Sequence, residues 1–247
     1  GIFDFCRIYY ASATENYGAI DCSGNVTFSN SEIAETKYEC VNAHGGGYFT
    51  AENSIFRDSS LAFGYYGGNK VRVYNCVIAN CTTAVRQSNK IFCSTIFYNC
   101  RNFTDQSGDR SSFSYCCFFN PLGYGDQNSE KYAKNTCIWA DPQFVNADKN
   151  DYRIKSTSPC VDAADGAVAP EFDYYGSPRM GVEGIRPTGT VAADGEVPDI
   201  GIYEVPGSAD VPSADLTVMD VSAPETLTIG QTVRISWTVK NIGEIDA

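Results

Sequence analysis

The sequence of 247 residues has a single histidine, His44, only two methionines, and no Cys-x-x-Cys pair among its eleven cysteines. A zinc site with the usual cysteine and histidine spacing is therefore not expected. Basic residues number 18 against 30 acidic ones and form no cluster, so no surface for binding nucleic acid is expected. No apolar run approaches the roughly 18 residues that cross a bilayer, so no membrane span is expected either.

The formal net charge of −12 suits a soluble protein outside the cell, or one that binds cations or repels acidic polymers. The eleven cysteines are too few for a small disulfide-stapled protein. They either pack inside as small apolar groups or pair as disulfides in an oxidising compartment. The chain opens with Gly1 and shows no signal-peptide pattern, which indicates a processed product or a segment of a longer protein.

A short apolar pattern recurs five times in the first half of the chain. Its copies end at Thr36, Ser59, Cys81, Cys100 and Pro121, at spacings of 23, 22, 19 and 21 residues. The copies are NSEIAET (30–36), NSIFRDS (53–59), NCVIANC (75–81), STIFYNC (94–100) and YCCFFNP (115–121). A period of this length is typical of a solenoid, and β-branched and aromatic residues without a helical stripe favour strands. The pattern predicts an all-β parallel β-helix with about 20 to 24 residues in each coil.

In a parallel β-helix, the same position in successive coils stacks about 4.8 Å apart. The final residues of the copies should therefore form one structural ladder, and the polar residues before them a second. The polar ladder contains Glu35, Asp58, Asn80, Asn99 and Asn120. Stacked asparagines hydrogen-bond along the axis, so we expect a structural role for them.

Two features of the stack stay open in the sequence. The inward-facing column is either Val77, Ile96 and Cys117 or the alternate set Ile78, Phe97 and Phe118. Cys81 and Cys100 should be stacked neighbours, either as a disulfide or as two thiols side by side.

After residue 121 the period is lost, and three stretches resemble a known family. They are ADPQFVNADKNDYRIKSTSPCVDAADG (140–166), DYYGSPR (173–179) and PDIGIYEV (198–205). Together they resemble the C-terminal choice-of-anchor Q region of secreted bacterial right-handed β-helix proteins. The resemblance covers residues 140–205 and implies a right-handed solenoid and an extracellular location. Cys160, Ala164 and Tyr175 depart from the usual pattern, which weakens the idea that Asp173 belongs to a paired-carboxylate site.

The organisation that follows has four parts. We expect coils over residues 1–125 and a C-terminal capping region over 126–205 that folds over the open solenoid end. Asp141, Asp162, Asp173 and Asp199 of this region should accept backbone N–H bonds or pair with arginine. Residues 206–213 have the composition of a linker.

Residues 214–247 begin a different pattern, with alternation at Leu216 and Val218 and again from Val233 to Val239. This stretch resembles the opening strands of the immunoglobulin-like CARDB module found in bacterial adhesion proteins, and it stops short of a full β-sandwich. Either the parent protein continues, or these strands complete the sheet of another subunit, which would make a homo-oligomer.

Fold alone does not decide whether a β-helix protein is an enzyme. His44 and the run Arg153 to Lys155 match letters of a polygalacturonase site, but the first lies in a glycine-rich turn and the second inside the capping motif. We therefore predict no catalytic, cofactor-binding or metal-binding residue. Calcium is the one ion considered, because DAADG (162–166) faintly resembles a calcium loop but lacks its later ligands. Tyr65 and Tyr66 are candidates for stacking on sugars.

The favoured function is a non-catalytic, secreted or cell-surface structural or adhesive protein, for example a rigid spacer or a fibre subunit. Its expected partners are other protein subunits or a cell-surface polysaccharide. The alternative is a carbohydrate-active enzyme, either a polysaccharide lyase or a glycoside hydrolase, or a carbohydrate-binding module. Three or more clustered carboxylates beside a lysine or arginine would favour the enzyme, and a smooth face without a cleft would favour the structural role.

Overall fold

A computed structural model describes residues 1–11, 17–44, 47–64, 71–86, 90–104, 111–120 and 133–207, together with the strands at 216–222 and 236–241. The chain divides into two compact units, Gly1–Gly207 and Ser208–Ala247, which are described separately below. Within the described residues no helix is long and apolar enough to cross a membrane.

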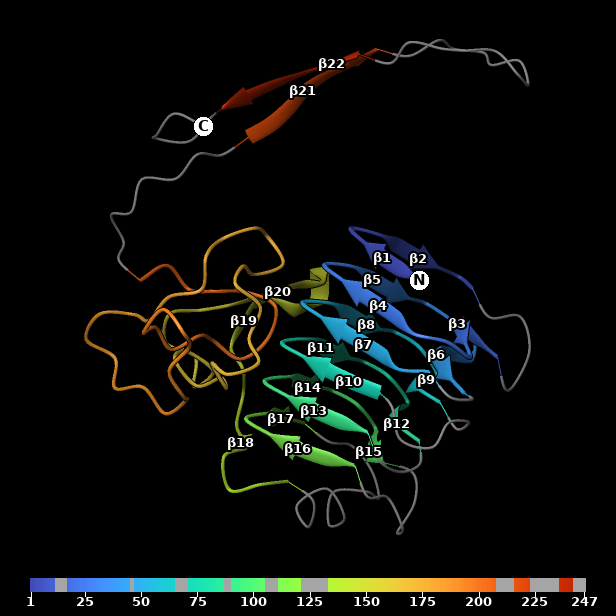
Figure 1. Ribbon diagram of the computed structural model, residues 1–247, viewed down its shortest axis with the longest axis horizontal. Coiled ribbons are helices and arrows are strands. Elements are labelled where there is room, and N and C mark those ends of the chain that lie inside the picture. Colours follow the sequence, from blue (N-terminus) through green and yellow to red (C-terminus); the bar gives the residue numbers. More distant parts are fainter. Residues whose placement is uncertain are drawn as a thin grey trace. The chain divides into compact units, whose positions relative to one another are not determined.

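The first unit is a parallel β-solenoid of about five turns, which confirms the predicted fold class (Figure 1). Each turn contributes one strand to each of three sheets. Sheet 1 contains β1 (Ile2–Asp4), β4 (Val26–Ser29), β7 (Phe49–Glu52), β10 (Val71–Tyr74), β13 (Ile91–Cys93) and β16 (Ser112–Ser114). Sheet 2 contains β2 (Arg7–Tyr9), β5 (Glu32–Ala34), β8 (Ile55–Arg57), β11 (Val77–Ala79), β14 (Ile96–Tyr98), β17 (Cys117–Phe119) and β18 (Ile138–Trp139). Sheet 3 contains β3 (Gly18–Cys22), β6 (Glu39–Ala43), β9 (Leu61–Phe63), β12 (Thr83–Val85) and β15 (Asn102–Thr104).

The recurring seven-residue pattern is one strand of sheet 2 with a corner at each end. At both corners the chain turns through a residue in the left-handed region, with φ between 44° and 57°. The first corner contains Phe5, Asn30, Asn53, Asn75, Ser94 and Tyr115, and the second contains Tyr10, Glu35, Asp58, Asn80, Asn99 and Asn120. Asparagine and aspartate tolerate this conformation better than other non-glycine residues, which explains their recurrence at both corners.

The residue after the first corner carries a small hydroxyl or thiol in each coil. Ser54 Oγ donates to the carbonyl of Glu52 at 2.7 Å and accepts the N–H of Ser31, one coil earlier, at 3.2 Å. Cys76 repeats this arrangement, since its thiol lies 3.1 Å from the carbonyl of Tyr74 and 3.4 Å from the N–H of Ser54. Serine, threonine and cysteine are interchangeable here because each is a small group that both donates and accepts. The need for such a group explains much of the cysteine content.

The residue after the second corner behaves in the same way where it is Thr36, Ser59, Cys81 or Cys100, whereas the first coil has Ala11 at this position. Thr36 N–H donates to Ser59 Oγ at 3.1 Å, and the Cys81 thiol lies 3.5 Å from the carbonyl of Ala79. Cys81 and Cys100 occupy this position in successive coils, and both are free thiols in the structure, as are the other nine cysteines. The pair is thus present as two buried thiols rather than as a disulfide.

The inward-facing column of sheet 2 contains Ile78, Phe97 and Phe118. Phe97 and Phe118 stack with ring centroids 4.9 Å apart, and Phe118 stacks on Trp139 at 4.6 Å. The alternate set Val77, Ile96 and Cys117 faces outward but is equally buried, because it belongs to a second apolar cluster. This double burial explains why the sequence could not distinguish the two sets.

Residues 140–207, here called the lateral cover, pack against that outward face of sheet 2. The cover contains β19 (Phe144–Asn146), a 3₁₀ turn (Ala147–Lys149) and β20 (Asp151–Ile154), followed by irregular backbone. Val77 and Ile96 pack in one cluster with Phe144, Tyr152 and Ile200. Figure 1 shows the cover beside the stacked strands of sheet 2. These contacts run along the side of the solenoid and bury the apolar outer column of sheet 2. The expected folding of this region over an open end stays a prediction.

The second unit is described only through β21 (Leu216–Ser222) and β22 (Ser236–Asn241). They pair antiparallel, with Val218 opposite Val239 and a register shift before Asp220. Val233 and Ile235, which were predicted to belong to the second strand, lie outside the described residues. The boundary at Gly207 falls within the predicted linker.

Candidate functional site

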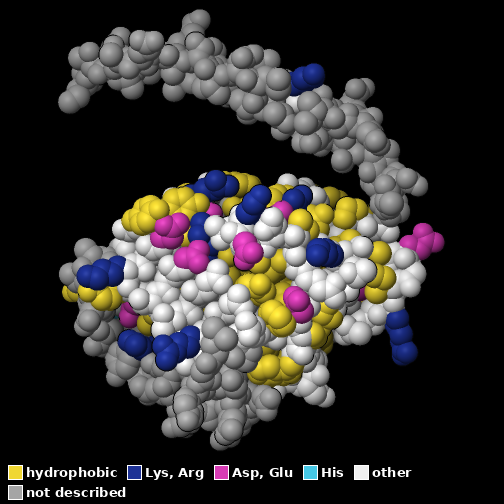
Figure 2. All heavy atoms as spheres, turned by 180° about the vertical axis from the view of Figure 1, so that it is seen from behind, with side chains coloured by type: hydrophobic (Ala, Val, Ile, Leu, Met, Phe, Trp, Pro, Cys, Tyr) yellow, Lys and Arg dark blue, Asp and Glu magenta, His cyan; other side chains and the backbone are white. Residues whose placement is uncertain are grey.

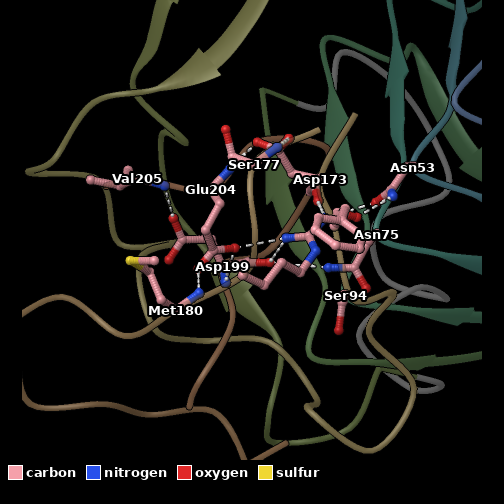
Figure 3. A network of polar contacts seen from close by, with 12 residues as sticks. Asn53, Asn75, Ser94, Asp173, Ser177, Met180, Asp199, Glu204 and Val205 are labelled. Carbon is pink, nitrogen blue, oxygen red and sulfur yellow. Dashed lines mark hydrogen bonds and ion pairs between the residues drawn. The ribbon is translucent and has the colours of Figure 1, made fainter. Parts of the chain in front are cut away.

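A buried polar network fastens the lateral cover to the first corner of the solenoid (Figure 3). The Arg179 side chain is only 4% exposed and lies 2.9 Å from Glu204 Oε2. Its second terminal nitrogen donates to Asn53 Oδ1 at 2.8 Å, and Asn75 Nδ2 donates to the carbonyl of Asp199 at 3.1 Å. The corner asparagines therefore bind the cover as well as turning the chain.

The aspartates of this network accept backbone N–H groups, as the sequence predicted. Both Asp199 carboxylate oxygens accept at 2.7 Å, one from Asp162 N–H and the other from Val205 N–H. Asp173 accepts from the N–H groups of Ser177, at 2.9 Å, and Glu204, at 3.0 Å. These carboxylates are occupied by the fold and closed to solvent, so we assign them a structural role.

We expect the unfolding free energy to fall as pH rises from about 4 to about 9. Burial raises the pKa of Asp199 to about 7 and the pKa of Glu204 to about 9. Both values exceed those of the unfolded chain, about 4, so protonation stabilises the fold and this contribution is lost as each folded pKa is passed. The slope is at most about 1.4 kcal/mol per pH unit for each proton. Urea unfolding across this pH range measures it.

The matched variants are Asp199→Asn and Asp194→Asn. The first holds the buried group neutral, so the slope between about pH 4 and pH 7 should flatten. The second removes an exposed acid from the same cover and should leave the slope unchanged. A slope that is identical in wild type and Asp199→Asn would contradict the prediction.

A polar groove of about 420 Å³ lies between the second corner of the solenoid and the 3₁₀ turn of the cover. One wall consists of second-corner residues and the strand residues beside them, and the other of residues on or beside the 3₁₀ turn. The lining residues are Glu35, Arg57, Asp58, Asn80, Tyr98, Asn99, Ala147, Asp148 and Asn150. Arg57 and Tyr98 occupy one outward column of sheet 2, with the small Ala79 between them.

Three carboxylates lie around Arg57 at one end of this groove. Its side chain is 7% exposed, and its Nε lies 2.6 Å from Glu32 Oε1. Its Nη1 pairs with Asp58 and lies 3.7 Å from Glu35 Oε1. Burial opposes the charge of Arg57, but hydrogen bonds to Asp58 and Glu32 outweigh it and raise the pKa of the guanidinium. Three clustered carboxylates beside a basic residue are the feature that was predicted above to favour an enzyme.

Four residues of the polar ladder line the groove, and the fifth hydrogen-bonds to its neighbour in the stack. Glu35, Asp58, Asn80 and Asn99 line the groove, whereas Asn120 donates to Asn99 Oδ1 at 2.8 Å. Thr36, Ser59, Cys81 and Cys100 are buried behind them. The predicted sugar-stacking residues Tyr65 and Tyr66 lie outside the described residues.

Other residues considered in the sequence have partners of their own. His44 Nε2 lies 2.8 Å from Asp21 Oδ1, and Arg153 pairs with Asp151 at 2.7 Å. Among the described residues, no group of three or more His, Cys, Asp or Glu side chains is arranged to hold a metal ion.

The wall that the cover contributes, which includes Asp148 and Asn150, was not predicted from the sequence. The polar run NADKND (146–151) was visible, but nothing in the repeat indicated that it would lie opposite Asn80 and Asn99. On the face seen in Figure 2, acidic and basic side chains are intermixed.

No family model matches this chain, and no curated protein matches it. The fold makes it a parallel β-solenoid protein. Its likeness to the choice-of-anchor Q region and to CARDB modules stays an interpretation of the sequence motifs.

Proposed function

We propose that this chain is a secreted or cell-surface β-solenoid scaffold that binds a neutral saccharide in the polar groove without cleaving it. The observation that carries the proposal is the groove itself, a volume of about 420 Å³ lined almost entirely by polar side chains. The stacked coils make its solenoid wall rigid, because each corner side chain is fixed by its neighbours above and below.

The lining matches the chemistry of a sugar. Carboxylates accept hydrogen bonds from hydroxyl groups, and the amides of Asn80, Asn99 and Asn150 both donate and accept. Three acidic side chains, Glu35, Asp58 and Asp148, face one cation, Arg57, so the groove repels uronates and other anionic saccharides. A neutral glycan is therefore the favoured ligand, and the net charge of −12 acts in the same direction.

We expect neutral oligosaccharides to bind the full chain and galacturonate oligomers of equal length to bind at least about tenfold more weakly. Asp148→Asn and Asn99→Ala should each weaken binding by about tenfold, because each removes a hydrogen bond worth about 1.4 kcal/mol. Asp194→Asn, an equal change of charge outside the groove, should leave the affinity unchanged. Isothermal titration calorimetry measures the affinity of the wild type for both saccharide classes and the affinity of each variant for the neutral one. Equal affinity for both saccharide classes, or an equal loss of affinity in Asp194→Asn, would contradict the proposal that the groove is the binding site.

The second candidate is a carbohydrate-active enzyme, favoured by Glu32, Glu35 and Asp58 around Arg57. Hydrolysis of a glycosidic bond needs two carboxyl groups on opposite sides of it, and Asp148 lies on the wall opposite Glu35. Release of reducing ends from a bound oligosaccharide, lost in Asp148→Asn, would establish the enzyme. A ligand that binds and stays intact would establish the scaffold.

The second unit supplies the proposed link to other subunits. Its described strands, β21 and β22, form a two-stranded sheet, and such a sheet is marginally stable alone. Pairing of residues 214–247 with a neighbouring chain would complete it and produce a homo-oligomer or fibre. The adhesive and extracellular roles are supported by the sequence motifs of the cover and of the second unit.

A further inference from the structure

Two cysteines lie side by side at the end of the solenoid. Cys116 directly precedes β17 and Cys137 directly precedes β18, and these strands pair in parallel with Cys117 opposite Ile138. The N–H of Ile138 donates to the carbonyl of Cys116 at 2.8 Å, which fixes the register at the two cysteines. Neighbouring strands lie about 4.8 Å apart, within the range of about 4.4 to 6.8 Å that a disulfide spans between Cα atoms.

The environment gives the two thiols different reactivity. Cys116 is completely buried, and Cys137 is partly buried and packs against the same core. A hydrogen bond with Cys116 lowers the pKa of the Cys137 thiol, and backbone hydrogen bonds and the charge of Lys134 act in the same direction. Burial raises the pKa of Cys116. A partly exposed thiol of lowered pKa beside a fully buried thiol is the arrangement of an attacking and a resolving cysteine.

We propose that Cys116 and Cys137 form a redox-modification site whose substrate is a low-molecular-weight disulfide such as oxidised glutathione. The Cys137 thiolate attacks one sulfur of the small disulfide, the bond between its two sulfurs breaks, and the first small thiolate leaves and takes a proton. Cys116 then loses its proton, attacks the Cys137 sulfur of the mixed disulfide and expels the second small thiolate, which is protonated in turn. The protein pair is oxidised by two electrons, and the small disulfide is reduced to two thiols.

The product would fasten the start of the lateral cover. β18 is the strand from which the chain enters the cover, so a Cys116–Cys137 disulfide ties this strand to the last coil of sheet 2. The site lies outside the polar groove and does not depend on the glycan proposal.

Other cysteines of the chain provide matched comparisons. Cys6 is also partly buried and directly precedes a strand of sheet 2, as Cys137 does. Its neighbour in the next coil is Ser31, however, whereas the neighbour of Cys137 is Cys116. Cys81 and Cys100 form a neighbouring pair in successive coils, but both are buried. Cys116→Ser is expected to fold, because Ser31 and Ser54 already occupy this position in other coils.

The experiment treats the reduced full chain with increasing oxidised glutathione, quenches with acid and maps cysteines by mass spectrometry. We expect the peptides of Cys116 and Cys137 to become linked, Cys6 to stop at the glutathione mixed disulfide, and Cys81 and Cys100 to stay reduced. In Cys116→Ser, Cys137 should retain glutathione, because its resolving thiol is gone. In Cys137→Ser, Cys116 should stay reduced.

Three outcomes would overturn the proposal. They are the absence of a linked peptide at every glutathione concentration, stable glutathione on Cys137 in the wild type, and linkage of Cys81 to Cys100 before Cys116 to Cys137. The last would show that adjacency alone, rather than the greater exposure of Cys137, determines which pair oxidises.

Discussion

Replacing Arg179 by alanine is expected to lower the unfolding free energy of the first unit by about 3 to 5 kcal/mol. Arg179 is the cation of the buried network, and it contacts Glu204, Asn53 and the carbonyls of Asp199 and Gly201. Removing it takes a buried donor from the Glu204 carboxyl group, the Asn53 amide oxygen and the carbonyls of Asp199 and Gly201. Each buried acceptor that loses its donor costs about 1 to 3 kcal/mol. Urea denaturation followed by circular dichroism measures the loss.

Arg153→Ala is the matched control for this variant. Arg153 pairs with Asp151 at 2.7 Å, but its side chain is 46% exposed, so the pair is screened by water. The expected loss is about 0 to 1 kcal/mol. Similar losses for the two variants would show that the Arg179 network does not hold the cover in place.

The location of the damage in Arg179→Ala is also testable. The network joins the cover to Asn53 and Asn75 of the first corner, whereas the inner core of the solenoid lies on the far side of sheet 2. Amide hydrogen exchange should therefore accelerate first in the cover and in strands β11 and β14, on whose outward side chains the cover packs. The strands of sheets 1 and 3 should keep their protection from exchange.

The architecture could be predicted from the sequence because stacking imposes the same requirement on every coil. The spacing of Thr36, Ser59, Cys81 and Cys100 fixed the coil length, and the recurring asparagines marked the second corner. The first corner was missed although Asn30, Asn53 and Asn75 begin the first three copies, because Ser94 and Tyr115 begin the last two and interrupt the pattern. A left-handed φ is a backbone property, and only the preference for asparagine reveals it in a sequence.

The groove was only half predictable for a different reason. Its solenoid wall belongs to the repeat, so Asn80 and Asn99 could be placed on one line. Its other wall, with Asp148, depends on where the cover docks, and docking is set by contacts between residues far apart in the chain, such as Asn53 with Arg179. The apolar outward residues Val77 and Ile96 were the available signal, because an outer face that is as apolar as the inner one requires a covering segment.

Replacing Phe97 by alanine is expected to destabilise the solenoid by about 3 to 5 kcal/mol. Phe97 is completely buried at the centre of the inner stack, with ring centroids 4.9 Å from Phe118, 5.4 Å from Phe92 and 5.6 Å from Phe113. Rings in neighbouring coils fix one another, and backbone hydrogen bonds hold the coils in register. The surrounding side chains can therefore fill only part of the cavity that loss of the Phe97 ring would leave.

Ile91→Ala supplies the comparison, because Ile91 is an apolar residue of the same coil whose side chain is 42% exposed on sheet 1. Its loss should be below about 1 kcal/mol, since little apolar surface returns to water. Urea unfolding of both variants measures the difference. If Phe97→Ala lowered the unfolding free energy no more than Ile91→Ala, the aromatic stack would not be the source of stability. The corner hydrogen bonds of residues such as Ser54 and Cys76 would then have to stabilise the solenoid.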